Sequence, residues 1–464
     1  MTVAGIILAA GHGTRMRTKK PKPLHTVAGL ALVAHTVQIM RLGGIEEIRV
    51  VLSQELAGNP AMREVLTHDI GISIQPESRG TADALKAVRS VFIGADSSDA
   101  DTLVVAPVDM ILVTGELVRR MIALHRETGA LSTILASNVD DASGLGRVKL
   151  DDLGQPVSVI EEDEADEKLL QCNLVNTAWY CFDNNWIWGA VDSIHPSHSG
   201  EVYLPQVIEK ASKLGRSMML VSNDDGGRGI NDLIQLADVE KIVRSRTNEF
   251  HMKNGVKIQD PSSTYIDVDV EIGFDTQIGA GSHIGTGSKI GCNVIVGSNT
   301  KIIRSQIADN AVVDGARVVD SIIGEKCFVG SNSLVRSGSE LKTEAKVGNL
   351  VEIKNSVIGS GSQISHFSYM GDAIVGVNVN IGAGTVTCNY DGIEKHRTVI
   401  GDGALIGSST MLIAPVTIGN SARTGAGAVV RSDVCSGETV VGVPAKPLAP
   451  NDLNLPDESS KTEI

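Results

Sequence analysis

The 464-residue sequence has few aromatic residues, no excess of positive charge and no long apolar segment. Aromatic residues make up 3% of the chain, although its hydrophobic fraction of 42% is ordinary for a globular protein. The formal net charge of −14 argues against nucleic-acid binding, because that function needs basic surface to displace counterions from phosphates. Small anionic substrates remain compatible with this charge, since a local basic cluster can bind phosphate inside an acidic protein.

Paired cysteines and membrane-spanning runs are also missing from the sequence. The six cysteines lie far apart and include no C-x-x-C pair, so the pattern indicates reduced thiols and neither a zinc site nor a redox site. The apolar run in "MTVAGIILAAGHG" is too short to cross a bilayer, and no basic region precedes it. We therefore expect a cytoplasmic protein without a membrane span.

The sequence does contain three successive patterns. Short apolar runs such as "AGIILAA", "IEEIRVVL" and "DTLVVAPVD" alternate with helix-like segments such as "TADALKAVRSVF" over residues 1–233, which predicts a mostly parallel α/β sheet of the Rossmann-like kind. Apolar residues then recur at helical spacing over 234–254, up to a glycine, and predict one linker helix. Residues 255–464 form the third part, with a polar tail from about 450 that we expect to be disordered.

The third part repeats an aliphatic residue at every sixth position. The series Ile272, Ile278, Ile284, Ile290, Val296 and Ile302 resumes at Ile323 and recurs as far as Ile418, with small residues between. Such hexapeptide repeats are typical of a parallel β-helix, in which each coil turns its aliphatic residues inward onto their equivalents in neighbouring coils. The 49 glycines of the chain suit the tight corners of such coils.

A glycine-rich turn follows the first predicted strand, in "LAAGHGTRMRTKKPKPLH". Gly11 and Gly13 can bring backbone N–H groups close to a nucleotide, while Arg15 and Lys22 can neutralise phosphate. The turn resembles the G-x-G-T-R-M and P-K signature of sugar-1-phosphate nucleotidyltransferases, and "QPESRGTADA" and "VVAPVDM" resemble two further marks of that family. With the repeats, the chain to about residue 447 resembles the bifunctional N-acetylglucosamine-1-phosphate uridyltransferases/glucosamine-1-phosphate acetyltransferases.

This resemblance implies a uridylyl-transfer site in the N-terminal domain and a left-handed β-helix in the C-terminal domain. By motif, Asp109 and Asn231 would bind catalytic Mg²⁺, and Arg15 and Lys22 would offset phosphate charge. The residues implied to hold UTP or UDP-N-acetylglucosamine are Leu8, Ala9, Ala10, Gly11, Lys22, Gln75, Gly80, Thr81, Gly146, Glu161, Asn176 and Asn231.

The repeats also contain residues that a coil built from small residues does not need. Arg336 and Lys354 lie 18 positions apart, three hexapeptides, so they should stack as a phosphate clamp. His366 and Tyr369 occupy one coil, and a histidine can accept a proton at cytosolic pH. The resemblance implies that His366 is the general base, with glucosamine 1-phosphate bound by Arg336, Lys354, Tyr369 and Asn380, and acetyl-CoA by Ala383, Asn389, Tyr390, Ser408 and Ala426.

The family likeness further implies a homotrimer that makes UDP-N-acetylglucosamine for cell-wall precursors. The insert "CNYDGIEKHR" interrupts the repeat and predicts a loop that leaves the coil, toward a neighbouring subunit. This chain differs from the family at Asp83, where histidine is usual, at Pro107 and Val108, where the family has Tyr-Gly, and at Gly442, where arginine can occur.

Other interpretations remain open at this point. Asp109 and Asn231 could each be a helix cap, Glu161 could belong to a solvated acidic face, and His366 could decorate an exposed corner. For the whole chain, one alternative is a single-function sugar-1-phosphate nucleotidyltransferase whose β-helix only assembles a trimer. The other is a non-enzymatic scaffold with a degenerate nucleotide fold.

Overall fold

The computed structural model describes residues 2–11, 13–77, 79–93, 98–196, 200–223 and 225–447. The polar tail from about residue 450 lies outside the described residues. The chain divides into two compact units, Met1–Val243 and Arg244–Ile464. The division falls within helix α10 (Leu233–Lys253), which ends before Gly255, a residue with φ of +87°.

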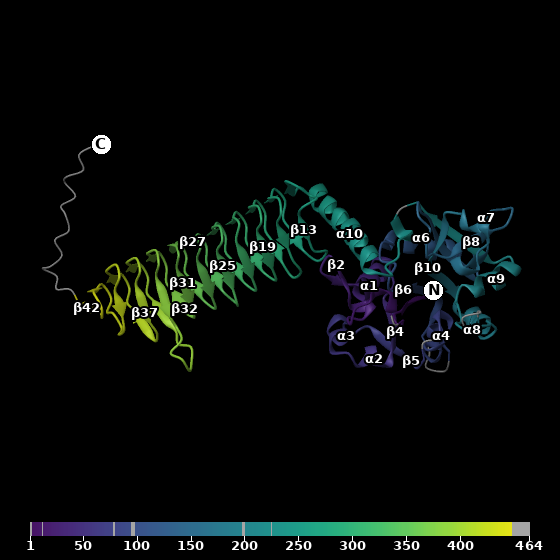
Figure 1. The fold of residues 1–464 in the computed structure, drawn as a ribbon, viewed down its shortest axis with the longest axis horizontal. Coiled ribbons are helices and arrows are strands. Elements are labelled where there is room, and N and C mark those ends of the chain that lie inside the picture. The colour runs from purple at the N-terminus through teal and green to yellow at the C-terminus, as the bar shows by residue number, and fades with distance from the viewer. Residues whose placement is uncertain are drawn as a thin grey trace. The chain divides into compact units, whose positions relative to one another are not determined.

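The first unit contains a mixed sheet whose strands are mostly parallel (Figure 1). Along the sheet the order is β11 (Ser217–Ser222), β7 (Ser132–Asn138), β10 (Leu174–Asp183), β6 (Ala100–Pro107), β1 (Thr2–Leu8), β4 (Glu47–Ser53) and β5 (Gly71–Gln75). In this series β10 runs antiparallel to both of its neighbours. The hairpin of β8 (Arg147–Leu150) and β9 (Pro156–Ile160) joins at β10. The predicted α/β class and mostly parallel sheet are confirmed.

Helices of this unit follow the local sequence signals. Helix α6 (Gly115–Thr128) begins where the Thr114 hydroxyl accepts a hydrogen bond from Leu117 N, and ends at Gly129 with φ of +60°. The segment predicted as one helix over 81–92 is broken into α4 (Thr81–Lys86) and α5 (Arg89–Phe92). The remaining α-helices are α1 (Leu32–Leu42), α2 (Gln54–Gly58), α3 (Pro60–Val65), α7 (Glu167–Leu170), α8 (Asn184–Asp192) and α9 (Gln206–Lys213).

The second unit is a stack of coils with three parallel faces, which confirms the predicted β-helix. The first face runs from β12 (Lys257–Ile258) to β41 (Thr439–Val441), with β42 (Lys446–Pro447) added antiparallel at its end. The second face runs from β13 (Tyr265–Ile266) to β40 (Val429–Val430), and the third from β14 (Glu271–Ile272) to β38 (Val416–Ile418). Figure 1 shows these coils stacked along one direction.

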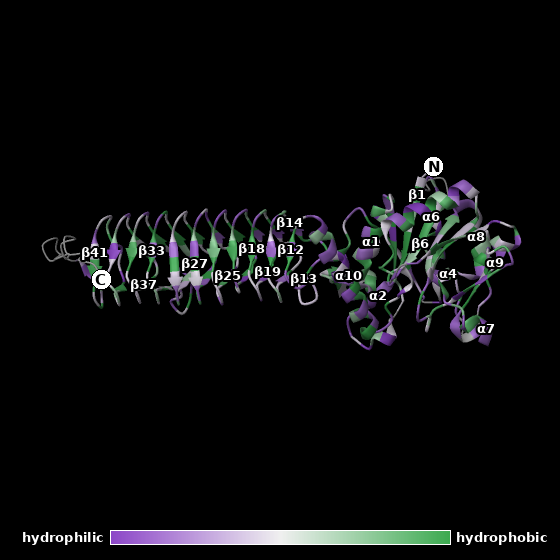
Figure 2. Ribbon diagram, turned by 90° about the horizontal axis from the view of Figure 1, so that it is seen from above, coloured by the Kyte–Doolittle hydropathy of each residue, from purple (hydrophilic) through white to green (hydrophobic). Residues whose placement is uncertain are grey.

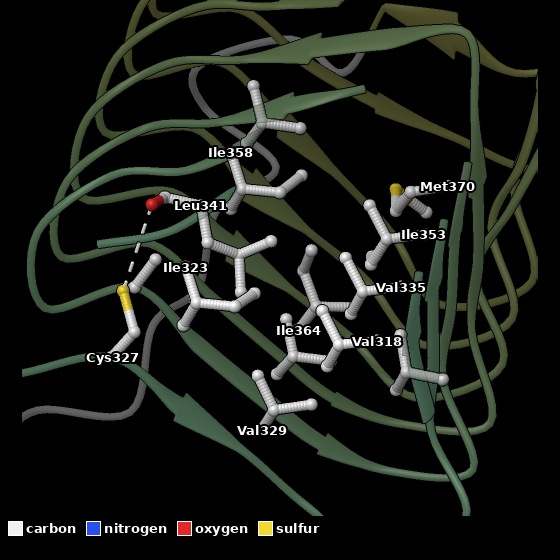
Figure 3. Close-up of a cluster of buried hydrophobic side chains, with 14 of the residues drawn as sticks. Val318, Ile323, Cys327, Val329, Val335, Leu341, Ile353, Ile358, Ile364 and Met370 are labelled. Atoms are coloured by element: carbon white, nitrogen blue, oxygen red, sulfur yellow. Dashed lines mark hydrogen bonds between the residues drawn. The ribbon is translucent and has the colours of Figure 1, made fainter. Parts of the chain in front are cut away.

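The hexapeptide positions form the interior of this stack. Ile302, Val335, Ile353 and Leu412 are fully buried in one hydrophobic cluster that continues from coil to coil. In Figure 3, side chains from successive coils such as Val318, Val335 and Ile353 lie one above another inside the helix. Figure 2 shows hydrophobic strands joined by corners that are largely polar. The corners use left-handed backbone, for example at Asn355, Phe367 and Asp372.

Candidate active sites

The glycine-rich turn lies at the carboxyl edge of the first sheet. Leu8, the last residue of β1, is paired in parallel register with Pro107, the last residue of β6. The turn after β1 and the segment from Pro107 to Asp109 are therefore neighbours at the edge where α/β sheets bind ligands. Ala9 and Ala10 are buried, Gly11 is exposed, and Ala9 N donates to Val51 O at 3.0 Å. Val108 is also buried, so its side chain does not project from this edge.

Lys22, Asp109 and Asn231 converge on this edge from distant parts of the sequence. The Lys22 ammonium contacts the Asp109 carboxylate and donates to Asn231 Oδ1 at 3.4 Å. Gly13, with φ of +58°, packs against the lysine, because a Cβ there would lie 2.7 Å from Lys22 Cβ. Arg15 is exposed on the same turn and makes no hydrogen bond or ion pair to another described residue.

The two candidate metal ligands suit magnesium in part. Asp109 and Asn231 offer a carboxylate and an amide oxygen, both hard donors, and Ile230 N ties the two segments together by donating to Asp109 O at 3.1 Å. Among the described residues no group of three or more acidic, histidine or cysteine side chains could hold a metal ion. An ion at this edge would therefore complete its shell with substrate phosphates and water, as Mg²⁺ commonly does.

A second group of candidates gathers at the end of β5. Gln75 is almost fully buried, and its Nε2 donates to Asp83 Oδ2 at 3.1 Å and to Gly80 O at 3.4 Å. Gly80 has φ of +114°, and a Cβ there would lie 2.6 Å from Val202 O, so this close approach requires glycine. The Thr81 hydroxyl accepts a hydrogen bond from Leu204 N at 2.9 Å.

A third group lies where the β8–β9 hairpin joins β10. Gly146 O accepts a hydrogen bond from Asn176 N at 2.9 Å, and a Cβ on Gly146 would lie 3.4 Å from Glu161 Oε2. The β10 strand is bulged between Asn176 and Trp179, with Ala178 at φ of +58°. Because of the bulge, both ends of the Asn176 side-chain amide make local hydrogen bonds. Nδ2 donates to Tyr180 Oη at 2.7 Å, and Oδ1 accepts from Ala178 N at 3.0 Å.

The strand order arranges these three groups in a row. The Gln75 group lies at the end of β5, and the glycine-rich turn and Asp109 follow β1 and β6. Asn176 lies near the start of β10, and because β10 runs antiparallel to β6, this start lies at the same edge of the sheet. Neighbouring strands are about 4.8 Å apart, so the row from β5 to β10 spans four spacings, about 19 Å. An extended nucleotide sugar has a comparable length, with a base at one end, phosphates in the middle and a sugar at the other end.

In the second unit, four candidate residues form one column along the corner between the first and second faces. His366 O accepts from Gly384 N at 3.1 Å, Ala383 O from Ser409 N at 2.7 Å, and Ser408 O from Gly427 N at 2.8 Å. His366, Ala383 and Ser408 therefore occupy equivalent positions in successive coils, and Ala426, just before Gly427, takes that position in the next. We call these four residues the corner column. The His366 side chain is exposed, on β30 (Gln363–His366).

Three glucosamine 1-phosphate candidates, Arg336, Lys354 and Tyr369, share the second face. Arg336 on β25 (Leu334–Arg336), Lys354 on β28 (Glu352–Lys354) and Gly371 on β31 (Tyr369–Gly371) are register partners, so the two cations stack as predicted. A Cβ on Gly371 would clash with the Tyr369 hydroxyl, so the phenol lies across this glycine, beside Lys354. Asn380 is not with them, because it lies on the first face in β33 (Asn380–Ile381).

Acidic partners orient the two cations. Arg336 Nε donates to Glu352 Oε1 at 2.9 Å, and Lys354 Nζ lies 3.8 Å from Asp372 Oδ2. Burial opposes ionisation of Asp372, but hydrogen bonds from Asn355 and Asn389 and the Lys354 charge outweigh it and lower the pKa of Asp372. The neighbouring Lys354 ammonium also lowers the pKa of Lys395. Lys354 thus lies in a polar cluster with Asp372 and Lys395, and its ammonium could bind an anionic ligand.

The insert forms a small hairpin, residues 389–396, which projects from the stack near β32 (Ala373–Val375) in Figure 1. Asn389 is buried against Asp372, whereas the Tyr390 ring is 60% exposed. Asp391 holds the hairpin by accepting from Ile393 N and Glu394 N and by pairing with His396 Nε2 at 2.6 Å. Asn389 and Tyr390 therefore lie across the second face from the corner column, and one chain does not bring the five acetyl-CoA candidates together.

Known proteins resemble this chain over both units. A MobA-like NTP transferase domain matches residues 5–179, and the bacterial transferase hexapeptide family, in six repeats, matches residues 397–432. The bifunctional protein GlmU of Heliobacterium modesticaldum is 38% identical over 94% of this chain and 94% of its own length. GlmU proteins of Exiguobacterium sibiricum and Thermosipho africanus are 39% and 38% identical, over 92% of this chain and 95% and 92% of theirs.

The chain belongs to the GlmU family. Like other GlmU proteins it is a bifunctional enzyme, a nucleotidyltransferase and an acetyltransferase in the synthesis of UDP-N-acetylglucosamine. The similarity to GlmU proteins extends over both units and 94% of the chain, which favours a bifunctional enzyme over one whose β-helix serves only for assembly. Among the described residues no helix is long and apolar enough to span a bilayer.

Sequence reasoning gave no site role to three carboxylates in this GlmU chain, although it noted Asp83 as a departure from the family pattern. Asp83 holds Gln75, Glu352 holds Arg336, and Asp372 faces Lys354. Glu352 could have been found, because it stands two residues before Lys354 on a strand and side chains two apart share a face. Asp372 could not, because its position depends on the left-handed corner backbone that turns it back toward Lys354.

Proposed function

We propose that the N-terminal unit transfers a uridylyl group and the C-terminal unit an acetyl group, with the site residues assigned as follows. Glucosamine 1-phosphate is acetylated first, and the resulting N-acetylglucosamine 1-phosphate is then coupled to UTP. The observation that carries this proposal is the pair of separate clusters, one around Lys22 and Asp109 and one around Lys354 and Tyr369, in a chain of a bifunctional family.

In acetyl transfer, Arg336 and Lys354 bind the sugar phosphate and Tyr369 orients the sugar. The second face is one strand wide, and β31 has three residues, so about 10 Å separates its two edges. This width lets a sugar phosphate held at Lys354 direct its amine toward His366 at the corner. His366 takes the proton from the amine as the nitrogen attacks the thioester carbonyl, the C–S bond breaks, and the proton passes to the thiolate of coenzyme A.

Acetyl-CoA is proposed to lie along the corner column, where small residues leave room for an extended chain. The coenzyme would contact Ala383, Ser408 and Ala426 in successive coils. Asn389 and Tyr390 would contact it from the other edge of the second face. Two chains side by side could bring these groups to one coenzyme. This arrangement supports a homotrimer in which each acetyl site is completed by a neighbouring subunit.

In uridylyl transfer, a phosphate oxygen of N-acetylglucosamine 1-phosphate attacks the α-phosphorus of UTP and pyrophosphate leaves. Gln75, Gly80 and Thr81 bind the base end, while Gly146, Glu161 and Asn176 bind the sugar. Lys22 and Arg15 offset the phosphate charge, and the Leu8 to Gly11 backbone lies against the nucleotide. Asp109 and Asn231 would hold Mg²⁺, which supplies positive charge for the leaving pyrophosphate. The substrates are cytosolic metabolites, in keeping with a cytoplasmic enzyme that supplies cell-wall precursors.

A coupled assay tests this division of labour. Full-length enzyme receives glucosamine 1-phosphate, acetyl-CoA, UTP and magnesium, and both free thiol and pyrophosphate are followed. We expect thiol without UTP, and pyrophosphate only when acetyl-CoA is also present. Asp109→Asn should remove pyrophosphate release and leave thiol release unchanged. Loss of both signals in this variant while it remains folded would contradict the assignment.

A further inference from the structure

The aspartate that departs from the family pattern holds a base-end residue. Asp83 lies in the first turn of α4, and its Oδ2 accepts a hydrogen bond of 3.1 Å from Gln75 Nε2. The same nitrogen lies 3.4 Å from Gly80 O. The two ends of an amide are assigned from their partners, and both partners here are acceptors. The nitrogen end of Gln75 therefore faces Asp83 and Gly80.

This assignment leaves the Gln75 oxygen as the group available to a ligand. None of the described residues donates a hydrogen bond to Gln75 Oε1. In the described part of the chain, this oxygen is not among the fully buried side-chain atoms that have no partner, so it keeps some exposed surface. Gln75 is only 3% exposed, which restricts the side chain to this arrangement. The residue thus presents an oriented acceptor at the end of β5.

We propose that Asp83 is a positioning residue that makes the base contact of Gln75 an acceptor contact and thereby selects UTP over CTP. The inference rests on the proposed function, in which the base lies at β5. Uracil carries an N–H at N3, which can donate to Gln75 Oε1. Cytosine has an unprotonated N3, an acceptor, and in the same pose it would meet the oxygen with two lone pairs opposed.

An aspartate fixes the amide more strictly than the histidine usual in the family. An ionised carboxylate can only accept hydrogen bonds, whereas a neutral imidazole has one donor and one acceptor nitrogen. Asp83 therefore excludes the reversed orientation of Gln75, in which Nε2 would point at the base. Gly80 O supports the same orientation but at a longer distance.

The test compares kcat/KM for UTP and CTP in full-length enzyme, with N-acetylglucosamine 1-phosphate and magnesium, by pyrophosphate release. Asp83→Asn keeps the size of the side chain but can donate to Gln75 Oε1, so the amide can reverse. We expect the UTP to CTP ratio to fall about tenfold, mainly through a higher KM for UTP. Glu77→Gln is the matched control, because Glu77 is an exposed acid of the same segment that pairs with Arg79 and not with Gln75. Its ratio should equal that of the wild type.

A double-mutant comparison separates positioning from other roles. In a Gln75→Ala background, Asp83→Asn should leave the ratio unchanged, because the residue through which it acts is gone. An unchanged ratio in Asp83→Asn alone, an equal loss with both nucleotides, or a further fall in the Gln75→Ala background would each overturn the inference. If the wild type releases no pyrophosphate from UTP while acetyl transfer proceeds, the proposed function fails instead. Urea unfolding followed by a probe in the first unit reports that this unit is folded in each variant.

Discussion

A single carboxylate orients a cation in each of the two candidate sites. Asp109 pairs with Lys22 at the candidate nucleotide site, and Glu352 pairs with Arg336 at the candidate acetyl site. In each case the acid restricts a long cation that would otherwise sample many rotamers, so a substrate phosphate meets a preformed donor. Both ion pairs are partly exposed, so they orient the cation more than they stabilise the fold.

Glu352→Gln should therefore weaken substrate binding more than catalysis. The amide still accepts a hydrogen bond from Arg336 but no longer pairs with its charge, so the guanidinium is held less firmly. We expect KM for glucosamine 1-phosphate to rise about three- to tenfold with little change in kcat. Glu340→Gln, a partly exposed acid paired with Lys342, serves as the control and should keep the wild-type KM. A drop in kcat at unchanged KM would contradict this role.

A buried histidine predicts how the first unit responds to acid. Burial lowers the pKa of His125 from 6.5 to about 4, and its Nδ1 lies 2.9 Å from Thr133 Oγ1. The unfolded chain binds a proton near pH 6.5 but the folded chain only near pH 4, so the free energy of unfolding falls as the pH drops through this window. This group alone should contribute a loss of about 2 kcal/mol between pH 8 and pH 5.

Urea unfolding at pH 8 and pH 5, followed by a probe in the first unit, measures this effect. His125→Gln should flatten the pH dependence, leaving the smaller part due to His25 and His35, whose pKa values burial also lowers. If the free energy of unfolding changed with pH as steeply in the variant as in the wild type, His125 would not be the cause of the acid sensitivity.

At the scale of elements, the hairpin 389–396 owes its shape to Asp391. Hydrogen bonds from the Glu394 backbone, His396 and the Ile393 backbone lower the pKa of Asp391. The carboxylate therefore remains ionised at neutral pH, and its contribution is lost only in strong acid, as the pH falls through the lowered pKa. Asp391→Ala removes all three contacts and should release the hairpin.

We expect this release to raise KM for acetyl-CoA severalfold, with Tyr390 and Lys395 no longer held, while pyrophosphate release from N-acetylglucosamine 1-phosphate is unchanged. Amide hydrogen exchange should accelerate in residues 390–396 and remain slow in the neighbouring coils. Glu394→Gln, an acid of the same hairpin that makes no ion pair with a described residue, is the control. Unaltered exchange in Asp391→Ala would contradict the role of this residue.

The regularity of the sequence pattern decides which elements could be predicted. Six-residue periodicity identifies the interior of the β-helix directly, because every coil places the same position inward, and Ile302, Val335 and Leu412 are all fully buried. The break between α4 and α5 was missed because "TADALKAVRSVF" is helix-forming throughout. Leu85 and Val88 are both fully buried, and Val88 N bonds to Leu85 O in a tight turn that ends the first helix.

At the scale of the whole molecule, motifs brought together many of the candidate residues of each site but did not indicate their acidic partners. Lys22 and Asn231 meet although 209 residues separate them, and a resemblance placed both in one site where periodicity alone could not. The contacts of Asp83 with Gln75 and of Asp372 with Lys354 depend on backbone geometry at a strand end and at a corner. These contacts could not be predicted, because the sequence around each acid carries no pattern of its own.

In the proposed function, His366 serves the first reaction alone, and the product of that reaction is the substrate of the second. The most direct measurement is pyrophosphate release by full-length His366→Ala with acetyl-CoA, UTP and magnesium. With glucosamine 1-phosphate we predict neither thiol nor pyrophosphate above about one thousandth of the wild-type rate. With N-acetylglucosamine 1-phosphate supplied instead, pyrophosphate should appear at the wild-type rate. Failure of this rescue in a folded variant, or undiminished thiol release from glucosamine 1-phosphate, would contradict the account.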